Sequence, residues 1–223
     1  MTPPEAFRRI VVVGAGGFAR EVVQWARHAW PDADRLLGGF LSADPQALRG
    51  HAQNLPILGS PATFIPASGD GLLLAIGIPE VRRRVAEDLL ERKATFISLI
   101  HPTAIVAGTA MIGDGSILCP GAIVSDAARL GRFVLMNYHT SIGHDASVGD
   151  YAVLSPYATL GGNAHIADDV FLGMHASVGP GKRMGDRSKL SANSCALTDV
   201  PRDSLVYGVP GRIQPLIRLD GLS

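Results

Sequence analysis

The sequence has few cysteines, few aromatic residues and no excess of charge of either sign. Its 223 residues include 2 cysteines and 6% aromatic residues, and 20 basic side chains balance 20 acidic ones. Balanced charge gives no long-range attraction for nucleic acids or other polyanions, so we expect no nucleic-acid partner. Cys119 and Cys195 are too few and too far apart for a metal-knuckle motif or a disulfide framework, and we expect both to be small packing residues.

Long apolar runs are also missing. The N-terminus, MTPPEAFRRI, lacks the apolar region of a signal peptide, and no later run approaches the ~18 apolar residues of a membrane span. Apolar residues still make up 47% of the chain, which is enough to bury a sizeable core. We therefore expect a soluble protein of one or two domains, located in the cytoplasm and without membrane insertion.

The second half of the sequence contains an aliphatic residue at every sixth position. Counted in steps of six from Ile100 to Leu190, all sixteen positions are aliphatic. The next position is small in most repeats, and the fourth after the aliphatic residue is usually Ala, Ser, Thr or Val. A helix needs an apolar spacing near 3.6 residues and a half-buried strand needs 2, so neither explains the pattern. A fixed short period indicates stacked repeats.

Each hexapeptide is predicted to form one flat face of a triangular coil. The aliphatic side chain would point inward, the fourth residue after it would fill the tapering interior, and the glycine would help the chain turn the corner. Three hexapeptides complete a coil, so the sixteen repeats predict a little over five coils. We place this prism at residues 99–203, with a tail at 204–223 that caps one end, because each coil contacts only its neighbours.

Residues 1–98 have a different pattern, in which strands alternate with helices. The expected order is a strand in RRIVVV, a helix in GFAREVVQWARHAW, a strand in LLGGFLSAD, a connection and helix start in LPILGSPATFI, a strand in LLLAIG, a helix in PEVRRRVAEDLLERK and a last strand in ATFISLI. Such alternation indicates a small, Rossmann-like domain with a parallel sheet.

A glycine-rich turn, Gly14-Ala15-Gly16-Gly17-Phe18-Ala19, connects the first strand to the first helix. Glycines at such a turn allow backbone N–H groups to approach a diphosphate, and the helix N-terminus favours its negative charge. A tight turn without a ligand is the alternative. An NAD-dependent hydride transfer is disfavoured, because the acidic residue expected near the end of the second strand comes only late, at Asp44.

The α/β domain with its GAGG turn, followed by an uninterrupted hexapeptide prism, resembles the hexapeptide-repeat nucleotide-sugar acyltransferases. This group includes sialic acid O-acetyltransferases and N-acetyltransferases of nucleotide-linked 4-amino sugars. The resemblance implies a left-handed parallel β-helix, a homotrimer, no metal, a nucleotide sugar held by the N-terminal domain, and acetyl-CoA or another acyl-CoA between neighbouring prisms. It also implies a nucleotide pocket lined by Gly14, Ala15, Gly16, Gly17, Phe18, Asp44, Gly77 and Ile78.

The motif IGHD contains His144 and Asp145, which match the histidine and acid pair of that family. By resemblance, His144 is the general base and Asp145 orients or polarises it. Acyl transfer requires such a base, because the attacking amine or hydroxyl must lose a proton and imidazole can accept one near neutral pH. A solvated surface histidine is the alternative interpretation.

The residues expected near the acyl donor also follow from the resemblance. Many relatives carry a second histidine near the thioester, where this sequence has Val153. Backbone N–H groups around Gly161 and Gly162 are expected to stabilise the oxyanion. The remaining candidates for coenzyme A contacts are Gly179, Lys182, Gly208 and Arg212, for which a solvated corner at Lys182 and a capping role for GVPGR are equally good explanations.

Other functional classes remain open at this stage. A zinc hydratase on the same prism would need three histidines that meet at a subunit interface. The positions one and two coils away from His144 carry no histidine, and His139 and His175 lie two coils apart, so we expect no metal site. A prism that binds nucleotide sugars without catalysis would not need the His144 and Asp145 pair. Within catalysis, the alternative is an acyltransferase with a non-nucleotide acceptor.

Overall fold

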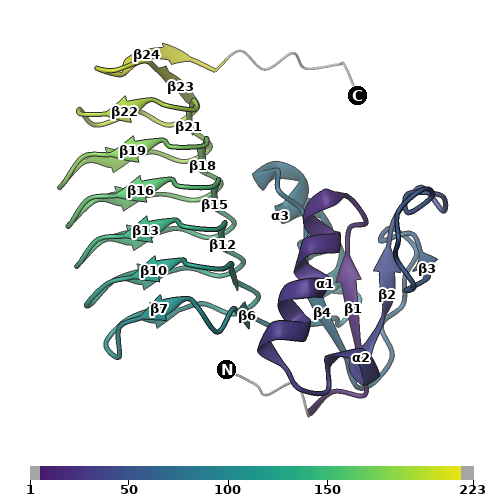
Figure 1. Ribbon diagram of the computed structural model, residues 1–223. Helices are drawn as coiled ribbons and strands as arrows, with labels where there is room; N and C mark the ends of the chain where they lie inside the picture. The colour runs from purple at the N-terminus through teal and green to yellow at the C-terminus, as the bar shows by residue number, and fades with distance from the viewer. Residues whose placement is uncertain (1–5, 217–223) are drawn as a thin grey trace.

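The computed structural model describes residues 6–216 and shows a triangular prism with a small α/β domain beside it (Figure 1). The α/β domain has a five-stranded parallel sheet in the order β3-β2-β1-β4-β5. Its elements are β1 (Arg9–Val13), α1 (Gly17–Ala29), α2 (Ala33–Leu36), β2 (Leu37–Leu41), β3 (Ile57–Gly59), β4 (Asp70–Leu74), α3 (Pro79–Glu91) and β5 (Thr95–Phe96). Because the strands are parallel, the ends of β1, β2 and β4 meet at one edge of the sheet.

Burial explains why these segments form these elements. The central strand β1 is fully buried from Ile10 to Val13, as its continuous apolar run requires. Helix α1 buries Val22, Val23 and Ala26 on one face, which confirms the helical spacing in the sequence.

Two segments of the N-terminal domain differ from the prediction. The predicted connection and helix start in LPILGSPATFI forms the edge strand β3 and a turn, since Pro56 and Pro61 restrict the backbone on both sides. The predicted single strand ATFISLI is divided between the domains. Its first part is β5 of the N-terminal sheet, and its second part, β6 (Leu99–Ile100), pairs with the prism.

The prism has three faces built from two-residue strands. The covered face, on which the N-terminal domain lies, contains β6, β9 (Ile117–Leu118), β12 (Leu135–Met136), β15 (Val153–Leu154), β18 (Phe171–Leu172), β21 (Lys189–Leu190), β23 (Ser204–Tyr207) and the antiparallel β24 (Arg212–Pro215). The small-residue face contains β7 (Ile105–Val106), β10 (Ile123–Val124), β13 (Ser141–Ile142), β16 (Thr159–Leu160), β19 (Ser177–Val178) and β22 (Cys195–Ala196). The basic face contains β8 (Met111–Ile112), β11 (Arg129–Leu130), β14 (Ser147–Val148), β17 (His165–Ile166) and β20 (Arg183–Met184).

The interior of the prism confirms the period of six. The repeating aliphatic residues and the fourth residues after them, such as Leu118 with Ala122 and Ile142 with Ala146, form one buried core. The predicted role of the glycines in turning the corners is wrong. From Ile112 onward, positive φ occurs three positions after each aliphatic residue of the repeat, mostly at residues other than glycine, for example Asp145 with φ 58°. Gly143 is small for another reason, because a Cβ there would lie 2.5 Å from the nitrogen of Gly162.

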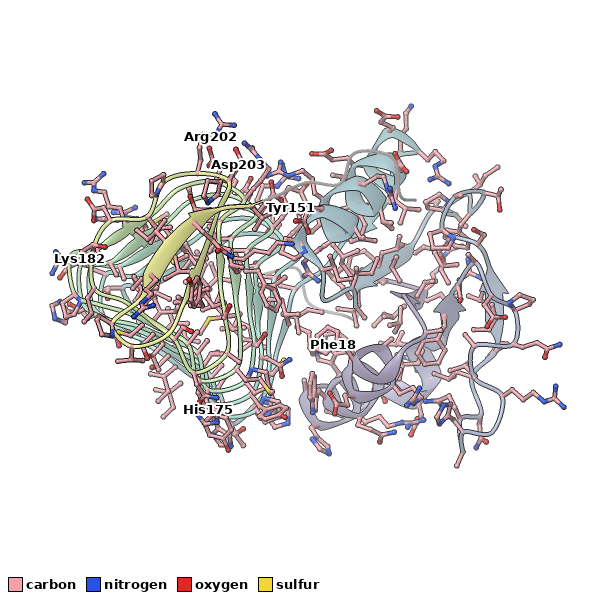
Figure 2. All side chains as sticks on the ribbon, turned by 90° about the horizontal axis from the view of Figure 1, so that it is seen from above. Phe18, Tyr151, His175, Lys182, Arg202 and Asp203 are labelled. Carbon is pink, nitrogen blue, oxygen red and sulfur yellow. The ribbon has the colours of Figure 1, made fainter. Side chains whose placement is uncertain are left out.

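The three corners of the prism carry different side chains. The open corner joins the small-residue and basic faces and holds Ala127, Asp145, Asn163 and Gly181 in successive coils. The docked corner joins the basic and covered faces and holds Phe133, Tyr151, Asp169 and Arg187. The aromatic corner joins the covered and small-residue faces and holds His139, Tyr157 and His175. Seen from above, Lys182, Tyr151 and His175 mark these three corners in turn (Figure 2).

The N-terminal domain packs on the covered face and on the docked corner. The outward side chains of the covered face share one apolar core with α1, and Leu99, Ile117 and Leu135 are at most 1% exposed. Phe133 and Tyr151 belong to a second core that includes residues of α3. The two domains are therefore held in a fixed relation by shared cores.

Both cysteines are free. Cys119 is buried between the domains, as expected for a packing residue, whereas Cys195 is half-buried on the small-residue face. Within residues 6–216, no helix has the length and apolar character needed to cross a bilayer.

Candidate active site

His144 and Asp145 lie at the open corner, in the turn between β13 and β14. Nδ1 of His144 is 2.8 Å from Oδ2 of Asp145, and the two side chains are 64% and 56% exposed. An ionised carboxylate accepts the Nδ1–H hydrogen, which leaves Nε2 as the ring atom that can take up a proton. The arrangement gives a histidine with a fixed tautomer and an accessible basic nitrogen.

Gly162 lies next to the His144 ring, one coil further along the same corner. A Cβ at this position would lie 2.5 Å from Nε2 of His144, so glycine leaves room for the ring. Asn163 donates its backbone N–H to the carbonyl oxygen of His144 at 2.9 Å, which fixes the spacing of the two turns. The N–H of Gly162 has no acceptor among residues 6–216. A free backbone donor thus lies close to the basic nitrogen.

At the docked corner, the positions equivalent to His144 and Gly162 carry aspartates in successive coils. Oδ1 of Asp150 accepts the N–H of Arg132 at 2.7 Å, and Oδ1 of Asp168 accepts the N–H of Asp150 at 2.9 Å. Asp186 continues this ladder with the N–H of Asp168 at 3.3 Å. The backbone N–H groups are therefore occupied at the docked corner, whereas the one at Gly162 is available to a ligand.

Of the predicted donor-site residues, four lie along the open corner with His144, namely Gly162, described above, and Gly161, Gly179 and Lys182. Gly161 and Gly179 are in register in successive coils. Lys182 occupies an interior position that is alanine in the two coils before it, and its partly exposed side chain marks the open corner (Figure 2).

The structure places Gly208 and Arg212 elsewhere, at the end of the prism. The N–H of Gly208 donates to Oγ of Ser194 at 2.9 Å, and its carbonyl accepts the N–H of Cys195 at 3.1 Å. Arg212 is exposed at the start of β24. This segment closes the last coil, which agrees with the capping alternative.

The prediction for Val153 is wrong. Its side chain is 3% exposed and lies in the core between the prism and the N-terminal domain, beside Leu135 and Phe171 on the covered face. A buried valine on this face offers no surface to an acyl donor. The resemblance could not show that the N-terminal domain covers that face.

The predicted nucleotide residues gather at the edge of the sheet where β1, β2 and β4 end. Gly14 follows β1 with φ 110°, and a Cβ there would lie 2.8 Å from the carbonyl oxygen of Ala75, so glycine is required. Additional Cβ atoms on Gly16 and Gly77 would meet nothing within 4 Å. Gly17 begins α1, whose first turn has no side-chain cap and no acidic residue. This edge is thus open and suited to an anionic group.

The other predicted nucleotide residues have different surroundings. Ala15 is buried in the core, and Phe18 packs against Trp25 with ring centroids 5.7 Å apart. Asp44 is exposed and its Oδ1 accepts the N–H of Gln46 at 2.8 Å, which closes the turn after β2. Ile78 is 57% exposed and precedes α3. Because the side chain of Ala15 is buried, this residue can offer only its backbone to a ligand.

One chain does not bring the nucleotide edge and His144 together. The N-terminal domain lies against the covered face, and the open corner is the one corner of the triangle that does not border this face. Viewed from above, Lys182 at the open corner points away from the N-terminal domain (Figure 2).

Sequence reasoning missed the stack of rings at the aromatic corner. The rings of His139 and Tyr157 lie 5.0 Å apart, and those of Tyr157 and His175 lie 4.7 Å apart with nearly parallel planes. The eighteen-residue spacing of these three residues would have revealed the stack. Tyr157 separates the two histidines, and among the described residues no group of three possible metal ligands exists.

Comparisons with known proteins agree with this architecture. Residues 9–89 match the family described as the PglD N-terminal domain. The chain is 33% identical over 72 residues to GDP-perosamine N-acetyltransferase from Escherichia coli O157:H7, an alignment that covers 32% of this chain and 33% of the relative. By sequence, the chain therefore spans about a third of the length of this curated relative.

Solved structures match over nearly the whole chain. PerB from Caulobacter crescentus, in complex with CoA and GDP-perosamine, has a TM-score of 0.82 at 25% identity, covering 92% of this chain and 97% of its own. The acetyltransferase domain of PglB from Neisseria gonorrhoeae, in complex with acetyl coenzyme A, has a TM-score of 0.81 at 26% identity, covering 92% and 98%. The chain is therefore similar in fold to solved nucleotide-sugar N-acetyltransferases over nearly its whole length, and it has the left-handed parallel β-helix of that fold.

Proposed function

We propose that the protein transfers an acyl group, most simply acetyl, from coenzyme A to the amino group of a nucleotide-linked amino sugar. The contact of 2.8 Å between Nδ1 of His144 and Oδ2 of Asp145, at an exposed corner with Nε2 beside Gly162, carries this proposal. The similarity to an N-acetyltransferase of GDP-perosamine supports an amino acceptor, and the PglB complex supports acetyl-CoA as the donor.

In this reaction the sugar amine attacks the carbonyl carbon of the thioester. Nε2 of His144 accepts the proton that the amine loses, and Asp145 stabilises the resulting imidazolium. The N–H of Gly162 donates to the oxyanion of the tetrahedral intermediate. Its collapse breaks the C–S bond, and the proton passes from His144 to the thiolate of coenzyme A. The products are the amide and free coenzyme A.

The acceptor is held by the N-terminal domain. The open edge at Gly16 and Gly77, together with the uncapped N-terminus of α1, provides backbone donors and a positive dipole for the diphosphate. Gly17, Asp44 and Ile78 border the same edge. Gly179 and Lys182, further along the open corner, contact the acyl donor.

In one chain the nucleotide edge and His144 lie apart, which leads us to a homotrimer that brings them together from neighbouring copies. The small-residue face suits packing against the other prisms around a threefold axis, because its central outward residues, Ser141, Thr159 and Ser177, are small and uncharged. The basic face instead exposes Arg129 and Arg183. In a cyclic assembly, the open corner of one copy meets the aromatic corner of the next.

The aromatic corner supports this arrangement. Tyr138 is 36%, Tyr157 43% and Met174 54% exposed in the single chain. Large apolar side chains gathered on one corner are typical of a contact surface. The partner then supplies the second wall of the acyl-donor site.

A cytoplasmic location stays a prediction.

Mass spectrometry of acyl transfer tests this function. Acetyl-CoA is offered with GDP-, UDP- and dTDP-linked 4-amino sugars, with the free amino sugars, and with serine as a non-nucleotide acceptor. We expect an acetylated product from at least one nucleotide sugar and none from the free sugar or serine. Equal acylation of the free sugar would contradict a role for the N-terminal edge. Binding of nucleotide sugars without any product would indicate a non-catalytic protein.

A further inference from the structure

Arg82 on α3 is a buried cation that joins the two domains. Its side chain is 0% exposed. Nη1 donates to the carbonyl oxygens of Leu74 at 2.7 Å and Ile76 at 2.9 Å, and Nε donates to the carbonyl oxygen of Phe133 at 2.8 Å. The first two acceptors belong to the N-terminal domain and the third to the docked corner of the prism.

This arrangement is costly for stability. All three hydrogen bonds go to main-chain carbonyls, and Nη2 is buried without a partner among the described residues. Burial lowers the pKa of Arg82 to about 9, so the group stays charged at neutral pH. The neighbouring Cys119 thiol supplies no counter-charge, because burial raises its pKa. An apolar side chain often stabilises such a position as well or better, which suggests that Arg82 is present for its geometry.

The acceptors of Arg82 show which geometry is held. Leu74 is the last residue of β4, and Ile76 comes immediately before Gly77 and Ile78 at the nucleotide edge. Phe133 is a corner residue whose ring is stacked on Tyr151 at 4.9 Å and is buried. The guanidinium therefore connects the loop at the nucleotide edge to a rigid point of the prism.

Arg83 provides a second tie from the same helix. Its guanidinium lies 4.2 Å from the ring centroid of Tyr151, and Nε contacts the two carboxylate oxygens of Asp169 at 2.8 and 2.9 Å. Phe133, Tyr151 and Asp169 occupy equivalent positions in three successive coils. Consecutive arginines thus fix the height of α3 along the prism axis.

We propose that Arg82 is a positioning residue, which holds the loop of residues 74–78 at a fixed height along the prism so that the nucleotide sugar presents its amine to the neighbouring open corner. The proposal rests on the proposed function for its kinetic consequence, but the placement of the loop can be measured without any substrate.

Steady-state kinetics and hydrogen exchange test this proposal. In Arg82→Met, and in Arg82→Lys, which keeps the charge but loses the planar fork, we expect KM for the nucleotide sugar to rise about tenfold or more. KM for acetyl-CoA should stay within about twofold of the wild-type value, since the donor contacts the prism. Amide exchange should become faster in peptides covering residues 74–80 and stay unchanged in those covering β2. Arg35→Met, an exposed arginine on α2, is the control and should change none of these values.

Other outcomes overturn the proposal. Unchanged KM and unchanged exchange in Arg82→Met would mean that the side chain only fills space. A lower active fraction with both KM values unchanged, and faster exchange throughout the N-terminal domain, would mean a general role in stability. If the wild-type protein acylates no nucleotide sugar, the proposed function fails. The exchange of residues 74–80 then still decides whether Arg82 fixes the loop.

Discussion

The open and docked corners of the prism share one backbone and differ in almost every side chain that points out of it. Both have left-handed residues in successive coils, such as Asp145 at the open corner and Tyr151 at the docked corner. At the docked corner, carboxylates occupy the backbone donors, and Arg83 with α3 covers the surface. At the open corner, His144 is exposed and the N–H of Gly162 is free within residues 6–216. The fold supplies similar turns, and side chains decide whether a turn is covered by a domain or stays open.

The largest effect is expected from His144→Asn at the open corner. Removing the base should lower kcat by about 10² or more, with little change in the melting temperature because the side chain is exposed. The initial rate of amide formation measures this loss. His165→Asn changes a histidine on the basic face and should retain most activity. Similar losses in the two variants would mean that His144 is not the base.

Gly162→Ala should have the next largest effect. The added methyl group displaces the His144 ring, since it would lie 2.5 Å from Nε2, and we expect kcat to fall about tenfold while the fold is kept. Gly108→Ala is a matched control, because Gly108 occupies the same corner position in an earlier coil and a Cβ there meets nothing within 4 Å. Equal kcat values in both variants would refute the positioning of His144 by Gly162.

At the docked corner, Arg83→Ala should change stability more than chemistry. The variant loses the contact with Tyr151 and the pair with Asp169, which is 9% exposed, and we expect the free energy of unfolding to fall by about 1–3 kcal/mol. Urea denaturation measures the change. Hydrogen bonds to Asp169 and Asp168 raise the pKa of Arg83 despite its burial, whereas burial raises the pKa of Asp169 despite this pair.

The matched control for Arg83→Ala is Glu87→Gln. This variant removes the exposed pair between Arg83 and Glu87, whose closest atoms are 3.4 Å apart. We expect a change in the free energy of unfolding below about 0.5 kcal/mol. A larger effect from Glu87 than from Arg83 would mean that the contacts at Tyr151 and Asp169 do not hold α3.

The smallest effect concerns the junction between α1 and the first coil. Nδ1 of His28 lies 2.9 Å from Nε2 of His101, and Nδ1 of His101 accepts the N–H of Thr103 at 3.1 Å. Burial and the nearby His28 lower the pKa of His101. The unfolded chain therefore binds protons more readily, and the free energy of unfolding should fall as the pH drops below the unfolded value of about 6.5.

Denaturation at several pH values checks this dependence. Between about pH 7 and pH 5, the free energy of unfolding should fall less in His101→Asn than in the wild-type protein, by roughly 1 kcal/mol or less. His51→Asn, which changes an exposed histidine, should leave the decline as in the wild-type protein. If the free energy of unfolding depends on pH in the same way in His101→Asn and in the wild-type protein, protonation of His101 does not affect stability.

The sequence predicted most of the fold because the period of six is a local property of the chain. Each inward aliphatic residue, such as Ile142, needs only its own coil and the next one to be buried. The exposed pair of His144 and Asp145 was also visible, since adjacent residues share one turn. Val153 was misplaced because its burial depends on the N-terminal domain, more than fifty residues away in the chain. The sequence places Arg82 only in an amphipathic helix, because its partners lie on two separate segments, the end of β4 with its following loop and a corner of the prism.

Complementation between two inactive variants tests the central claim that each active site combines the open corner of one copy with the nucleotide edge of another. Gly16→Trp should abolish nucleotide-sugar binding without strain, since a Cβ at Gly16 meets nothing within 4 Å, and His144→Asn removes the base. Each variant alone should be inactive.

When the two variants are co-expressed and form mixed trimers, we expect about a third of the wild-type activity, because one of the three sites in each mixed trimer draws an intact base and an intact nucleotide edge from different copies. Initial rates of acyl transfer by the purified mixed trimers measure this recovery. Mixed assemblies that stay as inactive as their parents would contradict the account, and they would show that a single chain must supply both the base and the nucleotide edge.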